Sequence, residues 1–118
     1  MAYMLLIVEP VQQREERSEE EGRLLYEQML RYTDDLKARG VLRASDSLKS
    51  HAEAARIEVR GGKRAVIDGP FAESKEMVGG FFYLDCATKA EAIAIASECP
   101  AAQWATVEVR EVGPCYSR

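Results

Sequence analysis

The fold is decided by the stretch Gly79-Gly80-Phe81-Phe82-Tyr83-Leu84-Asp85-Cys86, in which three consecutive aromatic residues follow a pair of glycines. Aromatic side chains favour β-strands, because they pack well on a pleated, half-buried surface. We therefore predict a strand over residues 79–86 that lies centrally in a sheet. The glycine pair at its start indicates either a β-bulge or a close approach of backbone or ligand.

A helix and a last strand are expected after this central strand. Thr88-Lys89-Ala90-Glu91 has the pattern of a capping box, in which the Thr hydroxyl and the Glu carboxylate satisfy the first backbone amides of a helix. Pro100 ends this helix, because the residue before a proline disfavours helical backbone. Thr106 to Val112 is expected to form the closing strand. The apolar face of the helix comprises Ala92, Ile95, Ala96 and Cys99.

The first part of the chain has the same order of strand, helix and strand. Met1 to Val8 is an apolar run that predicts a buried strand, and Glu9-Pro10 ends it. Ser18-Glu19-Glu20-Glu21 is a further capping box, so we expect a helix over residues 19–39 that Gly40 stops. Val41 to Leu48 is then expected to form a strand. The apolar face of this helix comprises Leu25, Met29, Tyr32 and Leu36.

A β-hairpin is predicted between these two parts of the chain. Arg56 to Arg60 and Lys63 to Ile67 flank Gly61-Gly62, after a flexible connection from Lys49 to Ala54. The whole order predicts a ferredoxin-like α+β fold in a single domain over residues 1–118, with two helices on one face of an antiparallel sheet. The other face of the sheet then needs cover, which self-association would supply.

Composition excludes several classes of protein. Hydrophobic residues make up 47% and charged residues 31% of the 118 residues, which is ordinary for a globular protein and argues against disorder. The net charge of −4 offers no general attraction to phosphate backbones, so no direct nucleic-acid binding is expected. The first apolar run is too short for a membrane span and lacks a cationic leader, so we expect a cytosolic protein without a membrane segment.

The cysteines predict neither disulfides nor a metal site. Cys86, Cys99 and Cys115 are odd in number and widely spaced, so we expect reduced thiols. Cys99, beside Pro100, is interpreted as a packing residue.

No phosphate-binding fingerprint is present, because the paired glycines precede a strand, and we expect no cofactor. His51, the only histidine, lies in the polar connection before the hairpin and is expected to be solvated.

A turn joins the hairpin to the central strand, beginning with Asp68-Gly69-Pro70. Asp accepts backbone amides, Gly tolerates positive φ and Pro pre-sets φ, so these residues have a shape-determining role that needs no ligand. Phe71 follows them. We interpret Phe71 as an anchor in the core or in the wall of a pocket.

Three charges follow this turn within four residues: Glu73, Lys75 and Glu76. If a short helical turn forms, the two carboxylates share one face and could act as general acid and base or hold a cation. The alternative is structural, in which Glu73 caps a backbone amide and Lys75 forms a surface ion pair. Spacing does not decide between these two interpretations.

The ordered set of motifs resembles the YCII-related family. Asp68 to Glu76 is similar to the DGPFAETKE signature of its DGPF branch, with Ser74 in place of threonine. The resemblance implies a homodimer in which two ferredoxin-like sheets face each other as an α/β barrel. The other matching stretches are Tyr3 to Ile7, Leu36 to Leu42, Gly79 to Phe82, Cys99 to Ala102 and Val107 to Arg110.

One part of the family pattern is missing. Shorter members carry a histidine in the first helix and an aspartate before the proline that ends the second, a pair suggested as a catalytic dyad. This chain has Gln28 or Met29 near the first place and Cys99 at the second. Functional groups are therefore expected elsewhere: Asp68, Glu73 and Glu76 as catalytic residues, and Phe71, Lys75, Tyr83 and Arg110 as ligand-binding residues.

Two hypotheses follow for the function. In the first, the protein binds a small polar molecule at the signature loop, defined as Asp68 to Glu76, and any catalysis is proton transfer. Asp68 would organise the loop, Glu73 or Glu76 would act as base or hold a cation, and Lys75 would pair with an anionic group. In the second, the protein is a non-catalytic interaction or regulatory module, linked to transcription. The sequence leaves open whether the protein is an enzyme.

Overall fold

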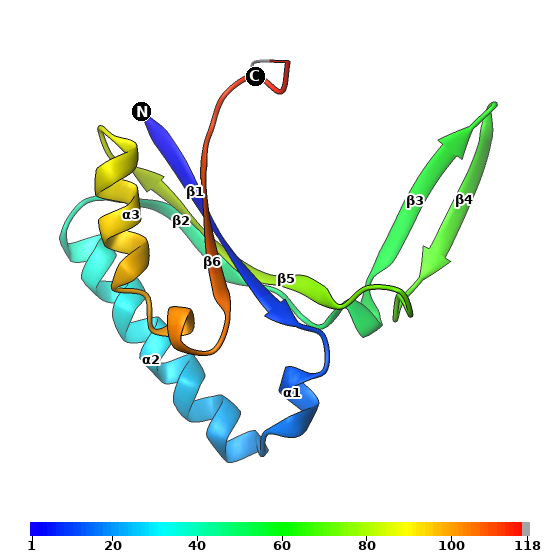
Figure 1. Ribbon diagram of the computed structural model, residues 1–118, viewed down its shortest axis with the longest axis horizontal. Helices are drawn as coiled ribbons and strands as arrows, with labels where there is room; N and C mark the ends of the chain where they lie inside the picture. Colours follow the sequence, from blue (N-terminus) through cyan, green and yellow to red (C-terminus); the bar gives the residue numbers. More distant parts are fainter. Residues whose placement is uncertain (117–118) are drawn as a thin grey trace.

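The computed structural model describes residues 1–116 and shows a four-stranded antiparallel sheet with helices packed on one face (Figure 1). The strand order is β2-β5-β1-β6, so the predicted aromatic strand does lie in the interior of the sheet. This mixed α+β arrangement is consistent with the predicted ferredoxin-like fold. The strands of the sheet are β1 (Ala2–Pro10), β2 (Leu42–Ser47), β5 (Glu76–Asp85) and β6 (Thr106–Glu111), and the longer helices are α2 (Glu19–Ala38) and α3 (Lys89–Ser97).

Both long helices begin where the capping residues predicted. The Ser18 Oγ atom accepts a hydrogen bond from the Glu21 backbone amide at 3.1 Å, and the Thr88 Oγ1 atom accepts one from the Glu91 amide at 3.2 Å. These contacts satisfy amides that have no partner within a helix. Gly40, with φ of 74°, follows α2 in the left-handed conformation that glycine adopts readily.

The core lies between the helices and one face of the sheet. Alternate residues of β1 are buried, as the strand period requires, and they meet apolar residues of α2 and α3. Tyr32 of α2 packs edge-on against Phe82 of β5, with ring centroids 5.3 Å apart. The Tyr32 hydroxyl donates a hydrogen bond of 2.6 Å to the Ile95 carbonyl of α3, so one side chain connects both helices to the sheet.

The opposite face of the sheet, called the open face below, is half-exposed and largely apolar. It is formed by the other alternate residues of β1 and β5, among them Met4, Leu6, Val8, Phe81 and Tyr83. Within residues 1–116, no helix packs on this face. The open face therefore still needs to be covered, as predicted, and a dimer would cover it.

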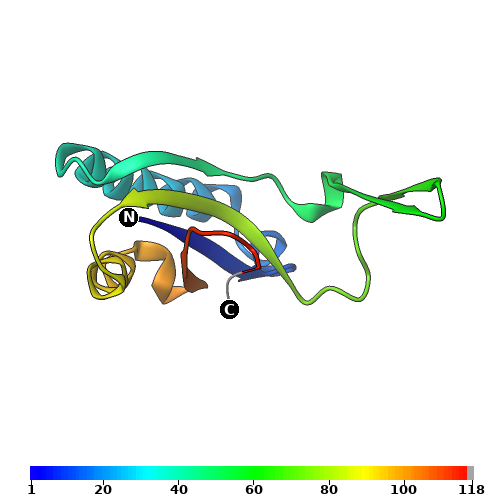
Figure 2. The ribbon, with the colours of Figure 1, turned by 90° about the horizontal axis from the view of Figure 1, so that it is seen from above.

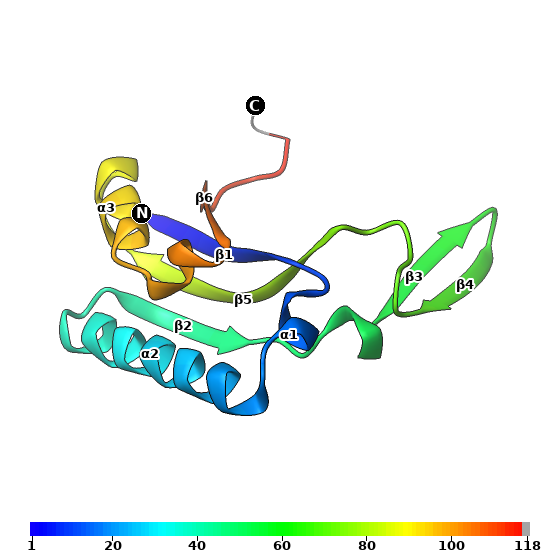
Figure 3. The same cartoon turned by 60° about the horizontal axis from the view of Figure 1, so that its bottom comes forward.

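The predicted hairpin forms but remains separate from the sheet. Its strands, β3 (Ala55–Arg60) and β4 (Lys63–Asp68), pair only with each other, and Gly61 and Gly62 make the turn with positive φ. Figures 2 and 3 show the hairpin projecting beyond the end of the sheet. Three short helical turns were not predicted: α1 (Gln13–Glu16), η1 (His51–Glu53) and η2 (Pro100–Gln103).

The glycine pair of the central strand makes a β-bulge. Ile7 pairs with Gly80 and Val8 with Val78, so Gly79 is the extra residue on β5. The bulge was one of the two interpretations offered by the sequence. The second, a close approach at this glycine, also holds, as the site below shows.

Candidate functional site

The signature loop connects the hairpin to the sheet, since Asp68 ends β4 and Glu76 begins β5. Gly69 lies against the backbone of η1, where its amide donates to the Ala54 carbonyl at 2.8 Å. A Cβ atom at Gly69 would lie 1.8 Å from the His51 carbonyl oxygen. The expectation that this glycine provides a positive φ is wrong, because its φ lies outside that region. Close approach of two backbones is what requires glycine here.

Phe71 is the anchor of the loop, as the sequence indicated. Its ring is buried, and the Arg56 guanidinium carbon of β3 lies 3.7 Å from the ring centroid. The His51 ring of η1 packs edge-on against it at 5.6 Å. Phe71 thereby joins the base of the hairpin to the start of β5 through a cation–π contact and an aromatic contact.

The expectation that His51 is solvated is wrong. The residue is half-buried beside Phe71, and its Nδ1 atom is buried with no hydrogen-bond partner among the described residues. The backbone amide of His51 also contacts the Met77 sulfur at 3.4 Å. Its sequence context gave no sign of this, because the aromatic partner lies twenty residues further along the chain.

The two carboxylates of the loop are separated rather than paired. Residues 72–73 form a turn but no helix, and Glu76 already belongs to β5, so the shared helical face does not form. Glu73 is 82% exposed and lies 3.7 Å from Arg56, whose Nη2 atom also donates to the Ser74 hydroxyl at 3.1 Å. Lys75 is exposed, and its carbonyl accepts from the Val11 amide at 3.0 Å. Glu73 and Lys75 therefore lie on the outer surface of the loop.

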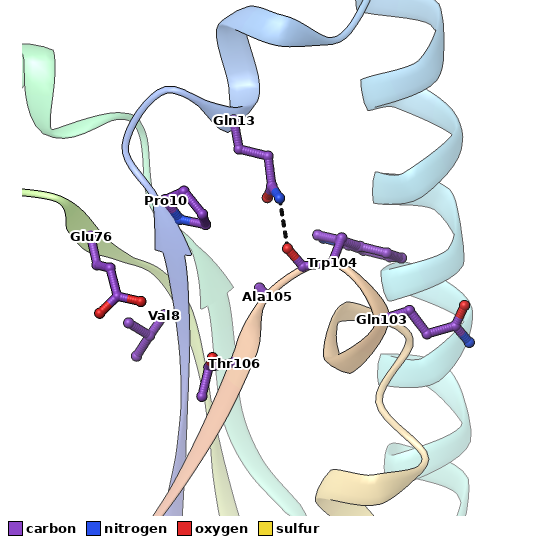
Figure 4. Close-up of a pocket in the computed structure, with 8 residues that line it drawn as sticks. All are labelled: Val8, Pro10, Gln13, Glu76, Gln103, Trp104, Ala105 and Thr106. Carbon is purple, nitrogen blue, oxygen red and sulfur yellow. Dashed lines mark hydrogen bonds between the residues drawn. The ribbon is translucent and has the colours of Figure 1, made fainter.

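Glu76 lines a hollow at the end of the open face. The hollow has a volume of about 570 Å³, and Figure 4 shows its lining side chains, which come from β1, α1, β5, η2 and β6. Its polar lining side chains come from Gln13, Glu76, Gln103 and Thr106, and in Figure 4 the Trp104 ring points away from Glu76 and Val8. The lining residues are Val8, Pro10, Gln13, Glu76, Gln103, Trp104, Ala105 and Thr106. Of the predicted catalytic residues, Glu76 lines this hollow, whereas Asp68 and Glu73 do not.

Gln13 lines the hollow and has an unsatisfied acceptor in its side chain. Its Nε2 atom donates a hydrogen bond of 2.6 Å to the Trp104 carbonyl, as the dashed line in Figure 4 shows. Its Oε1 atom is buried and has no hydrogen-bond partner within residues 1–116. A buried amide oxygen without a partner costs roughly 1–3 kcal/mol, which a donor from a ligand or an ordered water would recover. No local motif marks Gln13, because its partner Trp104 lies 91 positions away along the chain.

A buried ion pair holds the short helix that carries Gln13. The Arg14 guanidinium donates to both carboxylate oxygens of Glu9, at 2.7 and 3.1 Å, and to the Leu48 carbonyl at 2.8 Å. The Glu9 side chain is only 9% exposed. These contacts connect α1 to the ends of β1 and β2. Bidentate contacts between arginine and carboxylate are the stronger kind of ion pair, because two parallel hydrogen bonds fix the geometry.

Gly79 makes room for this ion pair. A Cβ atom there would lie 1.7 Å from the Glu9 Oε1 atom and 2.8 Å from the Arg14 Nη2 atom. The sequence contains a signal for this ion pair. Glu9 continues the alternation of buried residues formed by Tyr3, Leu5 and Ile7. A charged residue at a buried strand position indicates a partner, because a carboxylate is rarely buried without one.

Tyr83 and Arg110 lie far from the signature loop in one chain. Both lie opposite Met4 on the open face, Tyr83 from β5 and Arg110 from β6. Arg43 stacks over the Tyr83 ring at 5.4 Å, and Arg110 contacts Glu108 at 3.8 Å. Seven strand residues separate Tyr83 from Glu76, which corresponds to roughly 20 Å. The structure thus does not bring these two residues together with the loop.

Cys99, at one position of the missing dyad, contacts Met29, one of the two candidates for the other position. The Cys99 Sγ atom lies 4.0 Å from the Met29 sulfur, and both belong to the packing between α2 and the segment after α3. Burial raises the pKa of the Cys99 thiol, as it does for Cys86, so both favour the protonated form. Among the described residues none of the three cysteines is bonded to another, and no three His, Cys, Asp or Glu side chains are arranged to hold a metal ion.

Comparisons with known proteins agree with the motif pattern at the level of the family. The model of the YCII-related domain matches residues 1–115. An uncharacterized protein of Rhizobium meliloti (strain 1021), R00369, is 44% identical over 45 residues, which is 38% of this chain and 36% of that protein. The match therefore spans little more than a third of that relative. No helix among the described residues is long and apolar enough to cross a membrane.

Proposed function

The chain belongs to the YCII-related family, and on this premise we propose that it binds a small polar molecule in the hollow beside Glu76. We further propose that the chain belongs to the DGPF branch, on the basis of the signature that ends at Glu76. The loop contributes its last residue to the hollow, while Phe71, Arg56 and Ser74 hold the preceding part against the base of the hairpin. Binding, rather than loop shape alone, would then be the role of the signature carboxylate.

The observation that carries this proposal is that Gln13 lines the same hollow as Glu76 and has a buried Oε1 atom without a partner within the described residues. Both groups accept hydrogen bonds, and the Thr106 hydroxyl can donate or accept. Among the lining residues of the described chain, none is basic. The chemistry therefore favours a ligand with N–H or O–H donors, such as an amine, an amide or a polyol.

Proton transfer is the catalytic chemistry consistent with this arrangement. Glu76 is the titratable side chain among the lining residues, so it would act as the base in this proposal. Asp68 would organise the end of the hairpin, as expected from its turn position. Glu73 and Lys75, on the outer surface of the loop, would influence ligand entry by charge rather than by contact.

The proposal is tested by comparing two glutamate variants of the same loop. Thermal unfolding of wild type, Glu76→Gln and Glu73→Gln is measured against a panel of amines, amides, polyols, organic acids and divalent cations. A ligand at 100 times its Kd stabilises the folded state by about 2.7 kcal/mol. We expect the wild type and Glu73→Gln to respond alike, and Glu76→Gln to lose most of the response.

Each other outcome has a distinct meaning. An equal response of Glu76→Gln and wild type would place the ligand outside this hollow. If only Glu73→Gln loses the stabilisation by ligand, the ligand binds at the outer surface of the loop. If no compound in the panel stabilises the wild type, small-molecule binding is rejected and the interaction or regulatory module is favoured.

We also propose that the protein is a cytosolic homodimer in which the open faces of two sheets pack against each other. The half-exposed Met4, Leu6 and Phe81 support this, because contiguous apolar surface on a sheet is usually covered. The resemblance to the family implies the same α/β barrel. In such a dimer the hollow at the end of the open face would lie beside the partner subunit.

A further inference from the structure

The hairpin of β3 and β4 projects from the molecule without a covering layer. Its strands pair only with each other, and in Figures 1 to 3 it lies beyond the end of the sheet. The radius of gyration is 16.1 Å, whereas a compact domain of this length has roughly 13–14 Å. An isolated two-stranded hairpin is at best marginally stable in water, so this element needs a surface to pack against.

The hairpin also carries apolar side chains that its own chain does not cover. Ile57 and Val59 are 59% and 58% exposed, and Val66 lies on the same face because it pairs with Ile57. Both strands are edge strands, whose free backbone groups tend to find partners. A row of exposed β-branched residues on an uncovered edge is typical of an interaction surface.

Charge identifies the kind of surface that fits. Residues 55–68 contain four basic and two acidic side chains, and the rest of the chain contains twelve basic and eighteen acidic ones. The hairpin is thus +2, and the remainder of the molecule is −6. Arg60, Lys63 and Arg64 lie beside the turn at the tip of the hairpin, and the hairpin projects away from the rest of the chain (Figure 3). A second copy of this chain presents the complementary acidic surface.

We propose that the hairpin of each copy packs against the acidic body of a second copy, with Ile57, Val59 and Val66 covered and the basic tip paired with carboxylates. Two-fold symmetry makes this contact reciprocal, so a dimer has two such contacts. The segment from α1 to the start of α2 offers a dense set of candidate carboxylates, among them Glu15, Glu16 and Glu19. The inference deepens the proposed homodimer by assigning it an element, and it does not depend on the ligand site.

The first test compares two isoleucines of similar exposure. Ile57 lies on the hairpin and Ile93 on the outer face of α3, where it is 47% exposed. Sedimentation equilibrium is measured for wild type, Ile57→Asp and Ile93→Asp. We expect Ile57→Asp to raise the dimer Kd at least about tenfold and Ile93→Asp to leave it within about twofold. An unchanged Kd in Ile57→Asp would overturn the proposal.

The second test leaves Ile57, Val59 and Val66 unchanged, since aspartate at position 57 could unfold the hairpin itself. Arg60→Glu with Arg64→Glu reverses the charge of the tip without touching Gly61 or Gly62. We expect a dimer Kd raised about tenfold at low salt, and a smaller difference from wild type at high salt, because screening weakens the pairing. No effect at low salt would overturn the role of charge. A wild type that stays monomeric but binds nucleic acid through this tip would also overturn the second copy as partner.

Trypsin provides an independent readout of cover on the hairpin. Cleavage after Arg60, Lys63 or Arg64 should be slow above the dimer Kd and fast below it, because the packed tip is shielded. Leu6→Asp on the open face provides the comparison with the sheet interface. Leu6→Asp would give monomers if the sheet interface forms the dimer. If the tip of the wild-type dimer is then cleaved as fast as the tip of this monomer, the dimer is supported and the proposed hairpin contact is wrong. Neither readout involves the ligand response of Glu76→Gln, so the two proposals fail separately.

Discussion

Removing the charge of Glu9 should destabilise this protein far more than removing the charge of an exposed glutamate. Glu9→Gln leaves the Arg14 guanidinium facing a neutral amide in a site where the carboxylate is 9% exposed. Breaking a buried pair by removing one partner costs about 3–5 kcal/mol. The Arg14 side chain is 32% exposed and keeps its bond to the Leu48 carbonyl, which lowers the expected loss to about 2–3 kcal/mol.

The matched control is Glu20→Gln, which also breaks an ion pair with arginine. Glu20 contacts Arg23 at 2.6 Å, close to the 2.7 Å between Glu9 and Arg14, but the Glu20 side chain is 66% exposed. An exposed pair contributes less than about 1 kcal/mol. Burial is thus the main difference between the two variants.

Urea unfolding of wild type and both variants measures these free energies directly. A loss of 2–3 kcal/mol corresponds to a drop in Tm of about 10 °C for a chain of this length. Glu9→Gln should also weaken the response to any ligand of the hollow, because the ion pair holds the helix that carries Gln13. Equal and small losses in both variants would refute the reasoning, since they would mean that water solvates Glu9 as well as it solvates Glu20.

Three further predictions concern single contacts. Gly69→Ala should destabilise the protein by about 1–3 kcal/mol in urea unfolding, because its Cβ atom would meet the His51 carbonyl oxygen; an unchanged midpoint would mean that η1 moves freely. Burial raises the pKa of Tyr32 above its usual value of 10.0. The free energy of unfolding should therefore keep its full value below pH 10 and fall as the pH rises above 10, because the unfolded chain then loses the Tyr32 proton first. Tyr32→Phe should flatten this alkaline loss in unfolding curves measured across pH; an unchanged slope would argue against it. A thiol reagent should modify exposed Cys115 rapidly and buried Cys99 only on unfolding, which peptide mapping checks; rapid labelling of both would contradict the packing.

Local interactions explain the parts of the fold that could be predicted. Ser18 and Thr88 cap helices through hydroxyls that reach amides three residues away, and Gly40 follows α2 with positive φ. The strand alternation and the hairpin turn at Gly61-Gly62 likewise depend on neighbours in the chain. Such contacts span a few residues, so residue type and spacing were enough to place the strands and the two long helices to within a few positions, but not the short helical turns α1, η1 and η2.

The candidate site depended on contacts that no short stretch contains. Glu73 and Glu76 are close in sequence, yet one lies in an exposed turn and the other at the start of a strand, so the structure separates them. Gln13 and Trp104 meet across 91 positions. The sequence alone therefore determined the elements, their order and the family, because these follow from local preferences and motif spacing. Only the tertiary structure decided that Glu76 and Gln13 line the same hollow and that the hairpin stays out of the sheet, because packing between distant segments sets both.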